Sequence, residues 1–208
     1  MKDKMNMKRI ALIMAALAIL VTGCGKGQKF TLKGDMKTAN FKEAVDSLIL
    51  QSDGLPTVLV IPVKDGAFSF TGRVTRPALA TLKAPGETIE TKQLILEKGT
   101  ITFDHGLARG TPLNEAVFEL NQQVREVMMQ NRQNRDVIPG KTFEIFHDYL
   151  TKHPNDPSAV SALMIARHFT KPDKMSELIA LTSKSIQKER HVEQLTLAIR
   201  QQRVKPVL

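Results

Sequence analysis

The thiol of Cys24 is the most reactive group in the sequence, and it belongs to the only cysteine among the 208 residues. A single cysteine cannot form an intramolecular disulfide, a C-x-x-C redox site or a Cys-rich zinc site. The chemistry left to such a thiol is nucleophilic attack or covalent modification. Which of the two applies depends on the segment that surrounds Cys24.

Five histidines are the other candidates for metal binding or proton transfer. None of them lies in H-E-x-x-H or in another metal-binding spacing. His147 and His153 are six residues apart, so they cannot share one face of a helix. We therefore interpret the histidines as surface or helix-end residues. They are His105, His147, His153, His168 and His191.

Two further residue pairs could carry chemistry. Asp104 and Glu115 could act as an acid and a base, but nothing in the sequence brings them into one cleft, so we interpret them as surface carboxylates. Met128-Met129 could form a soft metal site or a sticky surface, yet we expect one of the two to continue the apolar stripe of a helix. The sequence contains no G-x-S-x-G motif and no phosphate-binding glycine loop after a strand. It therefore predicts no catalytic residue, no cofactor and no metal.

The N-terminal segment has the composition of an export signal. Residues 1–9 are basic, and Ile10 to Val21 form an apolar stretch of 12 residues. As a helix this stretch would rise about 18 Å, whereas a bilayer core of about 30 Å requires roughly 20 apolar residues. The pattern predicts a cleavable signal peptide over residues 1–23 rather than a membrane span. The alternative is an uncleaved apolar helix.

The four residues Val21-Thr22-Gly23-Cys24 follow directly. They resemble the lipobox of bacterial lipoproteins, in which a branched apolar residue and two small residues precede a cysteine. The resemblance implies signal-peptidase cleavage between Gly23 and Cys24 and acylation of the Cys24 thiol, which removes it as a nucleophile. More than one acyl chain is needed for stable anchoring, and a triacylated cysteine supplies three. Residues 24–29 then form a short, glycine-containing tether.

Part of the net positive charge of the chain comes from this N-terminal segment. The formal net charge is +9, and it falls to +6 without the first nine residues. The remaining Lys and Arg residues alternate with Asp and Glu, which is typical of a solvated surface. We therefore expect no nucleic-acid partner.

The next part of the chain, residues 30–105, has the pattern of an antiparallel β domain. Thr57–Val63 is β-branched and apolar, and the Asp65-Gly66 pair separates it from the alternating run 67–72, which predicts a hairpin. Pro62 places its strand at a sheet edge or at a bulge. A second hairpin is predicted between Gln93–Glu97 and Thr100–Asp104. Further strands are expected at Lys29–Lys33, Ser47–Gln51 and Leu79–Leu82. The predicted fold class is α+β, with an antiparallel β-sandwich or small barrel followed by helices.

Residues 111–203 show helical periodicity. Thr111-Pro112 suits an N-cap with proline at the first helical position. Pro139-Gly140 is expected to end the helical region that begins there. Three helices are then expected over residues 142–152, from Asp156-Pro157 to about 168, and from Pro172 onward. A last helix is predicted over residues 184–203.

Two elements of the β half form an ordered pattern, K-D-G-x-F-x-F-x-G over residues 64–72 and L-E-x-G-x-I over residues 96–101. Together with Phe30–Gly34, Gly110–Asn114 and His153–Pro157, they resemble the domain of unknown function 4369 and the helical linker that precede thioredoxin-like domains in lipoproteins of Gram-negative anaerobes. The resemblance implies periplasmic thiol-disulfide chemistry, but the thioredoxin domain with its W-C-x-x-C-type site has no counterpart in these residues.

Three functional hypotheses follow. The first is a non-catalytic, lipid-anchored envelope lipoprotein that serves as a binding or scaffold module, with a membrane and a periplasmic protein as partners. The second is a truncated or split thiol-disulfide oxidoreductase whose catalytic domain is encoded elsewhere. The third is an envelope protein that binds a small molecule in a groove between the β domain and the helices. No acidic residue directly follows Cys24, which favours an anchor in the outer membrane that faces the periplasm.

Overall fold

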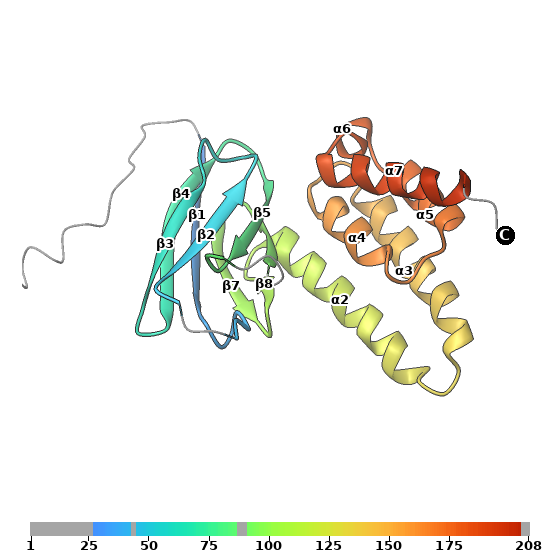
Figure 1. Cartoon of the computed structure of the whole chain (residues 1–208), viewed down its shortest axis with the longest axis horizontal. Helices are drawn as coiled ribbons and strands as arrows, with labels where there is room; N and C mark the ends of the chain where they lie inside the picture. The colour runs from blue at the N-terminus through green and yellow to red at the C-terminus, as the bar shows by residue number, and fades with distance from the viewer. Residues whose placement is uncertain (1–26, 43–44, 87–90, 205–208) are drawn as a thin grey trace, which may run out of the picture.

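The computed structural model of the chain describes residues 27–42, 45–86 and 91–204, without the side chains of residues 202–204. Eight strands come first and the described helices follow, so the fold is α+β, as predicted (Figure 1). The strands form one body of the molecule, and the long helix α2 leads from it to the remaining helices.

The strands form a single nearly closed sheet, which decides between the two predicted architectures in favour of a barrel. Its order is β6-β5-β2-β3-β4-β1-β7-β8, with β6 and β8 at its ends lying close to one another. All pairs are antiparallel except β1 with β7. The strands are β1 Gln28–Asp35, β2 Ser47–Ser52, β3 Leu59–Lys64, β4 Ala67–Val74, β5 Ala78–Lys83, β6 Thr91–Leu96, β7 Gly99–Asp104 and β8 Leu107–Arg109.

Alternating side chains of these strands fill the barrel. Phe30 and Leu32 of β1, and Leu48 and Leu50 of β2, are fully buried at every second position. This is the period that a strand requires when one face points into a core. In the alternating run 67–72, Phe68 is likewise buried, whereas Ser69 and Thr71 are exposed.

The hairpin predicted at Asp65-Gly66 is confirmed. Asp65 has φ 52° and Gly66 has φ 76°, the left-handed conformation that a type I′ turn needs at both positions. Pro62 does not lie at an edge of the sheet, because β3 pairs with both β2 and β4. However, the ladder with β4 contains only the pairs of Val63 and Lys64 and ends before Pro62, which has no N–H to donate.

The predicted hairpin between β6 and β7 is wrong. β6 pairs with β5, whereas β7 pairs with β1 and β8. A type I′ turn at Lys98-Gly99 would need positive φ at the lysine, and only Gly99 has it. The true hairpin of β7 is made with β8 through His105 and Gly106, with φ 48° and 81°. Histidine is one of the few residues that tolerates this conformation.

The helices follow the predicted order, with corrections to where some of them begin and end. They are α2 Pro112–Gln130, η1 Arg135–Val137, α3 Ile138–Lys152, α4 Ser158–Ala166, α5 Pro172–Ala180, α6 Lys184–Gln187 and α7 Arg190–Val204. Pro139-Gly140 opens α3 instead of closing the region, since proline fits the first helical turn. α4 ends two residues before the predicted end.

The last predicted helix is two helices, α6 and α7. Ile186 and Val192 are both buried in the helical core. Residues six apart are separated by about 120° around one helix, so a continuous helix could not direct both side chains to the middle of the core. The break between Gln187 and Arg190 lets both face the core.

Met128 and Met129 of α2 are 43% and 56% exposed, so the expectation that one of them enters the core is wrong. Val127, which is partly buried, continues the stripe of Leu120 and Val124 instead. The helices enclose a second core around Phe146, Leu150 and Leu163, separate from that of the barrel.

Candidate functional site

Gly23 and Cys24, the predicted cleavage and lipidation residues, lie outside the described residues. The described chain begins one residue before β1, where Nη1 of Arg73 donates a hydrogen bond to the carbonyl oxygen of Gly27 at 2.9 Å. The barrel therefore holds the chain at Gly27, three residues after Cys24. In the part of the chain that the structure describes, no helix combines the length and the apolar character that a membrane span requires.

The largest concentration of buried polar groups lies at the seam of the barrel, where α2 covers the gap between β6 and β8. The seam contains a hollow of about 250 Å³ that is bounded by residues of β6, β8, α2 and α4. It is also where the ligand-binding hypothesis places a groove. The polar groups around this hollow decide what it can bind.

Asn114 of α2 is 2% exposed and bonds to β6 with its side chain. Its Oδ1 accepts the N–H of Ile95 at 2.9 Å, and its Nδ2 donates to the carbonyl oxygen of Ile95 at 2.7 Å. The same Nδ2 donates to Oγ1 of Thr111 at 2.7 Å. The amide thus pairs with the backbone of β6 as a neighbouring strand would, and none of its polar atoms remains for a ligand.

The carboxylate of Glu97, at the end of β6, caps the start of α2. Its Oε1 accepts the backbone N–H of Leu113 at 2.8 Å and that of Asn114 at 3.2 Å. These N–H groups have no partner inside the helix, and the N-terminus of a helix favours a negative charge. The predicted boundary at Thr111-Pro112 is confirmed, but Thr111 makes no capping bond to the helix. The capping side chain comes from the barrel.

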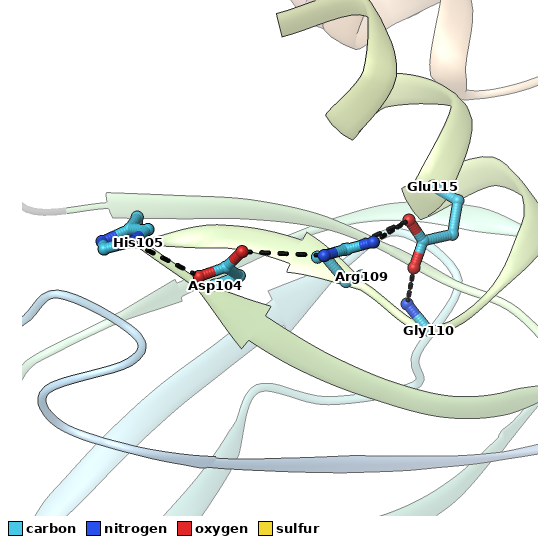
Figure 2. A network of polar contacts seen from close by, with 5 residues as sticks. All are labelled: Asp104, His105, Arg109, Gly110 and Glu115. Carbon is cyan, nitrogen blue, oxygen red and sulfur yellow. Dashed lines mark hydrogen bonds and ion pairs between the residues drawn. The ribbon is translucent and has the colours of Figure 1, made fainter. Parts of the chain in front are cut away.

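A polar network on the surface extends this junction, as Figure 2 shows. Nε and Nη2 of Arg109 both donate to Oε2 of Glu115 at 3.1 Å, and Oε1 of Glu115 accepts the N–H of Gly110 at 2.8 Å. Nη1 of Arg109 also lies 3.6 Å from Oδ2 of Asp104, and Oδ1 of Asp104 is 3.7 Å from Nε2 of His105. The guanidinium of Arg109 rests on the ring of Phe118 at 4.1 Å.

This network brings Asp104 and Glu115 close to one guanidinium, although the sequence offered no reason to place them together. The hydrogen bond from Gly110 and those from Arg109 lower the pKa of Glu115. The bonds to Glu115 raise the pKa of Arg109. A general acid requires a raised carboxyl pKa, so these shifts describe a structural ion pair that stays charged at neutral pH.

A second hollow, of about 370 Å³, lies among α4, α5 and α7. Arg167, His168 and His191 are exposed at its rim, and Met164 and Met175 contribute apolar surface. Nε of Arg167 lies 3.3 Å from Nε2 of His168. Arg167 on this open rim could contact an anion. The hydroxyl of Thr170 is buried there without a hydrogen-bond partner, but the residue as a whole is only partly buried.

The histidines occupy surface or helix-end positions, as expected. His105 is in the β7–β8 turn, His147 lies exposed on α3, and His153 follows the last residue of α3. The ring of His153 stacks on Tyr149 at 4.5 Å, and its Nδ1 lies 3.1 Å from Oδ2 of Asp156. The described residues include no group of three or more His, Cys, Asp or Glu side chains arranged to hold a metal ion.

The sequence did not reveal that Asn114 and Glu97 join the barrel to the helices. The only local signal was a polar residue in the first turn of a helix, which is common on any surface. Their partners are separated by 16 to 19 residues along the chain, a distance at which no period connects them.

No family model matches the chain, and no curated protein or solved structure is significantly similar to it.

Proposed function

We propose that the protein is a non-catalytic lipoprotein of the cell envelope, anchored to a membrane through acylated Cys24, whose barrel and helices form a binding or scaffold module. The observation that carries the proposal is the sequence Val21-Thr22-Gly23-Cys24 directly after a 12-residue apolar stretch with a basic flank. An outer-membrane anchor that faces the periplasm is the proposed location.

The position of the first strand supports this proposal. β1 begins at Gln28, so the proposed cleavage site between Gly23 and Cys24 precedes the first strand in the sequence. The polar groups of the seam support the non-catalytic part, because Asn114, Glu97, Arg109 and Glu115 are bonded to one another and to the backbone. The same bonding disfavours a small-molecule site in the seam.

The test is mass spectrometry of the protein made from its full sequence in a Gram-negative host. We expect a mature N-terminus at Cys24 that carries acyl chains. Cys24→Ser should remain unprocessed and unacylated, because serine lacks the thiol that receives the lipid. Thr22→Ser is the matched control, since it keeps a small residue before the cleavage site. A full-length chain with an unmodified thiol would contradict the proposed anchor.

A separate measurement tests the non-catalytic part. The mature chain should not support thiol-disulfide exchange in an insulin reduction assay, because its one cysteine is consumed by lipid. Turnover without added thioredoxin would contradict the proposal and favour the oxidoreductase alternative. A W-C-x-x-C segment in the reading frame that follows the gene would identify the chain as one part of a split oxidoreductase.

A further inference from the structure

The two ends of the barrel differ in composition, and the end nearest to Cys24 is distinctive. β1 enters the barrel there, with Gln28 opposite Val74 of β4. Since β3 runs antiparallel to β4, the first residues of β3 lie at the same end. We refer to it as the tether end. The β3–β4 turn marks the opposite end of the barrel (Figure 1).

The tether end exposes apolar side chains. Val58 precedes β3 and is 54% exposed, and Val60 within β3 is 66% exposed. Ile61, which pairs with Leu48 of β2, is fully buried, so the alternation of the strand directs Val60 to the outer surface. Two exposed valines at neighbouring outward positions form a small apolar surface at the end of the barrel that lies closest to the tether.

The same end carries an excess of positive charge. Its exposed charged side chains are Lys29, Arg73, Arg76 and Lys98, against Asp53 alone among the exposed acidic residues of the strand ends and loops described there. At the opposite end, four exposed lysines are accompanied by the exposed carboxylates of Asp46 and Asp65, and partly buried Lys83, Lys92, Asp35 and Asp104 add two charges of each sign. The four lysines are Lys33, Lys37, Lys42 and Lys64. Both ends therefore carry more exposed basic than acidic side chains, and the tether end has the fewer exposed carboxylates, one against four basic side chains.

The length of the tether restricts where this end can be. Gln28 is the fourth residue after Cys24, and four residue-to-residue steps of a fully extended chain span at most about 14 Å. An acylated Cys24 lies at the bilayer surface, so the tether end cannot move further from that surface than this distance. Exposed apolar residues with basic neighbours are the composition that binds the interface of anionic membranes.

We propose that the tether end docks on the membrane, an inference that rests on the proposed anchoring through Cys24. Val58 and Val60 contact the boundary of the acyl chains, and Lys29, Arg76 and Lys98 lie over lipid phosphates. The β3–β4 turn then faces away from the bilayer. The partner of this surface is an anionic lipid headgroup layer.

The test uses the absence of tryptophan in the sequence. Val60→Trp places a single reporter at the tether end, and Ala67→Trp is the matched control at an exposed position next to the β3–β4 turn. The mature chain is coupled through its one thiol to a maleimide phospholipid in vesicles of phosphatidylcholine and phosphatidylglycerol. Brominated phosphatidylcholine should quench the fluorescence of Val60→Trp and leave that of Ala67→Trp unchanged. Val58→Trp repeats the measurement if Val60→Trp does not fold.

The charges are tested on the Val60→Trp background. Replacing Lys29, Arg76 and Lys98 by Gln should lower the ratio of docked to undocked protein by about 100-fold, since each basic side chain contributes about fivefold at an anionic surface. The control replaces Lys37, Lys64 and Lys83, outside the tether end, and should leave quenching unchanged.

Three results would overturn the proposal. The first is equal quenching of Val60→Trp and Ala67→Trp, and the second is unchanged quenching after the three basic side chains are neutralised. The third is a dimer in sedimentation that Val60→Asp dissociates, because this result would assign the face to a second copy of the chain. Chemical coupling supplies the anchor in this experiment, so the result is independent of acylation in cells. Failure of the anchoring itself is detected separately, as an unmodified thiol in the mass spectrum.

Discussion

Asn114 takes the place of a neighbouring strand at the open side of β6. The barrel is not fully closed, and an end strand leaves a row of backbone N–H and C=O groups without partners. The side-chain amide of Asn114 supplies both a donor and an acceptor to Ile95, and it does so from a helix that belongs to the other half of the chain. Because Asn114 and Ile95 are both buried, water cannot readily replace these bonds.

Asn114→Ala should lower the free energy of unfolding by about 2–3 kcal/mol, because it leaves a buried N–H and a buried C=O of Ile95 unpaired. Asn121→Ala is the matched control on the same helix, since the Asn121 amide bonds only to the carbonyl oxygen of Val117 one turn earlier. We expect that control to change stability by less than about 1 kcal/mol. Urea denaturation of the two variants measures the difference. Equal losses would show that the bonds to Ile95 are not what stabilises the seam.

At the scale of single elements, the β3–β4 turn is the feature that local sequence determines most fully. Gly66 has φ 76° and open space around its Cα, so the backbone conformation alone limits which residue can stand there. Gly66→Ala should lower the free energy of unfolding by about 1 kcal/mol. The control is Gly140→Ala in the first turn of α3, where φ is negative and space is equally open, and it should be neutral or slightly stabilising. Thermal unfolding compares them, and equal effects would contradict the argument from φ.

Strands, turns and helices that the local sequence determines were predictable from the sequence. The strands and side chains that they pair with in space were not. The alternation of residues 67–72 and the Asp65-Gly66 pair determine a strand and a turn by themselves. The choice of β1 and β8 as neighbours of β7 depends on how eight strands close into a barrel, so the short Lys98-Gly99 connection gave a wrong hairpin. The division of α6 from α7 likewise depends on the core that receives Ile186 and Val192. For the same reason the lipidation prediction at Cys24 could be made from four adjacent residues, whereas the pairing of Asn114 with Ile95 could not be predicted.

At the scale of the whole molecule, two hydrophobic cores are joined along β5, β6 and α2. The barrel core and the helical core contain different residues, but Leu79 on the outer face of β5 packs against the helical core. Glu97 and Asn114 fasten α2 to the end of β6 beside it. A chain with two cores unfolds in one transition only when the contacts between them are strong enough to couple both.

Leu79→Glu should separate the unfolding of the two cores, because it places a charge in the half-buried contact between them, at a cost of about 2 kcal/mol. Val60→Glu is the matched control, an equal change at an exposed outward position of β3. Tyr149, the single tyrosine, lies against the helical core and reports its unfolding by fluorescence, while hydrogen exchange of β1 and β4 reports the barrel. We expect the two probes to give one urea midpoint in the wild type and in Val60→Glu. In Leu79→Glu the tyrosine midpoint should fall below that of the barrel, and coincident midpoints there would show that α2 and the seam alone couple the two cores.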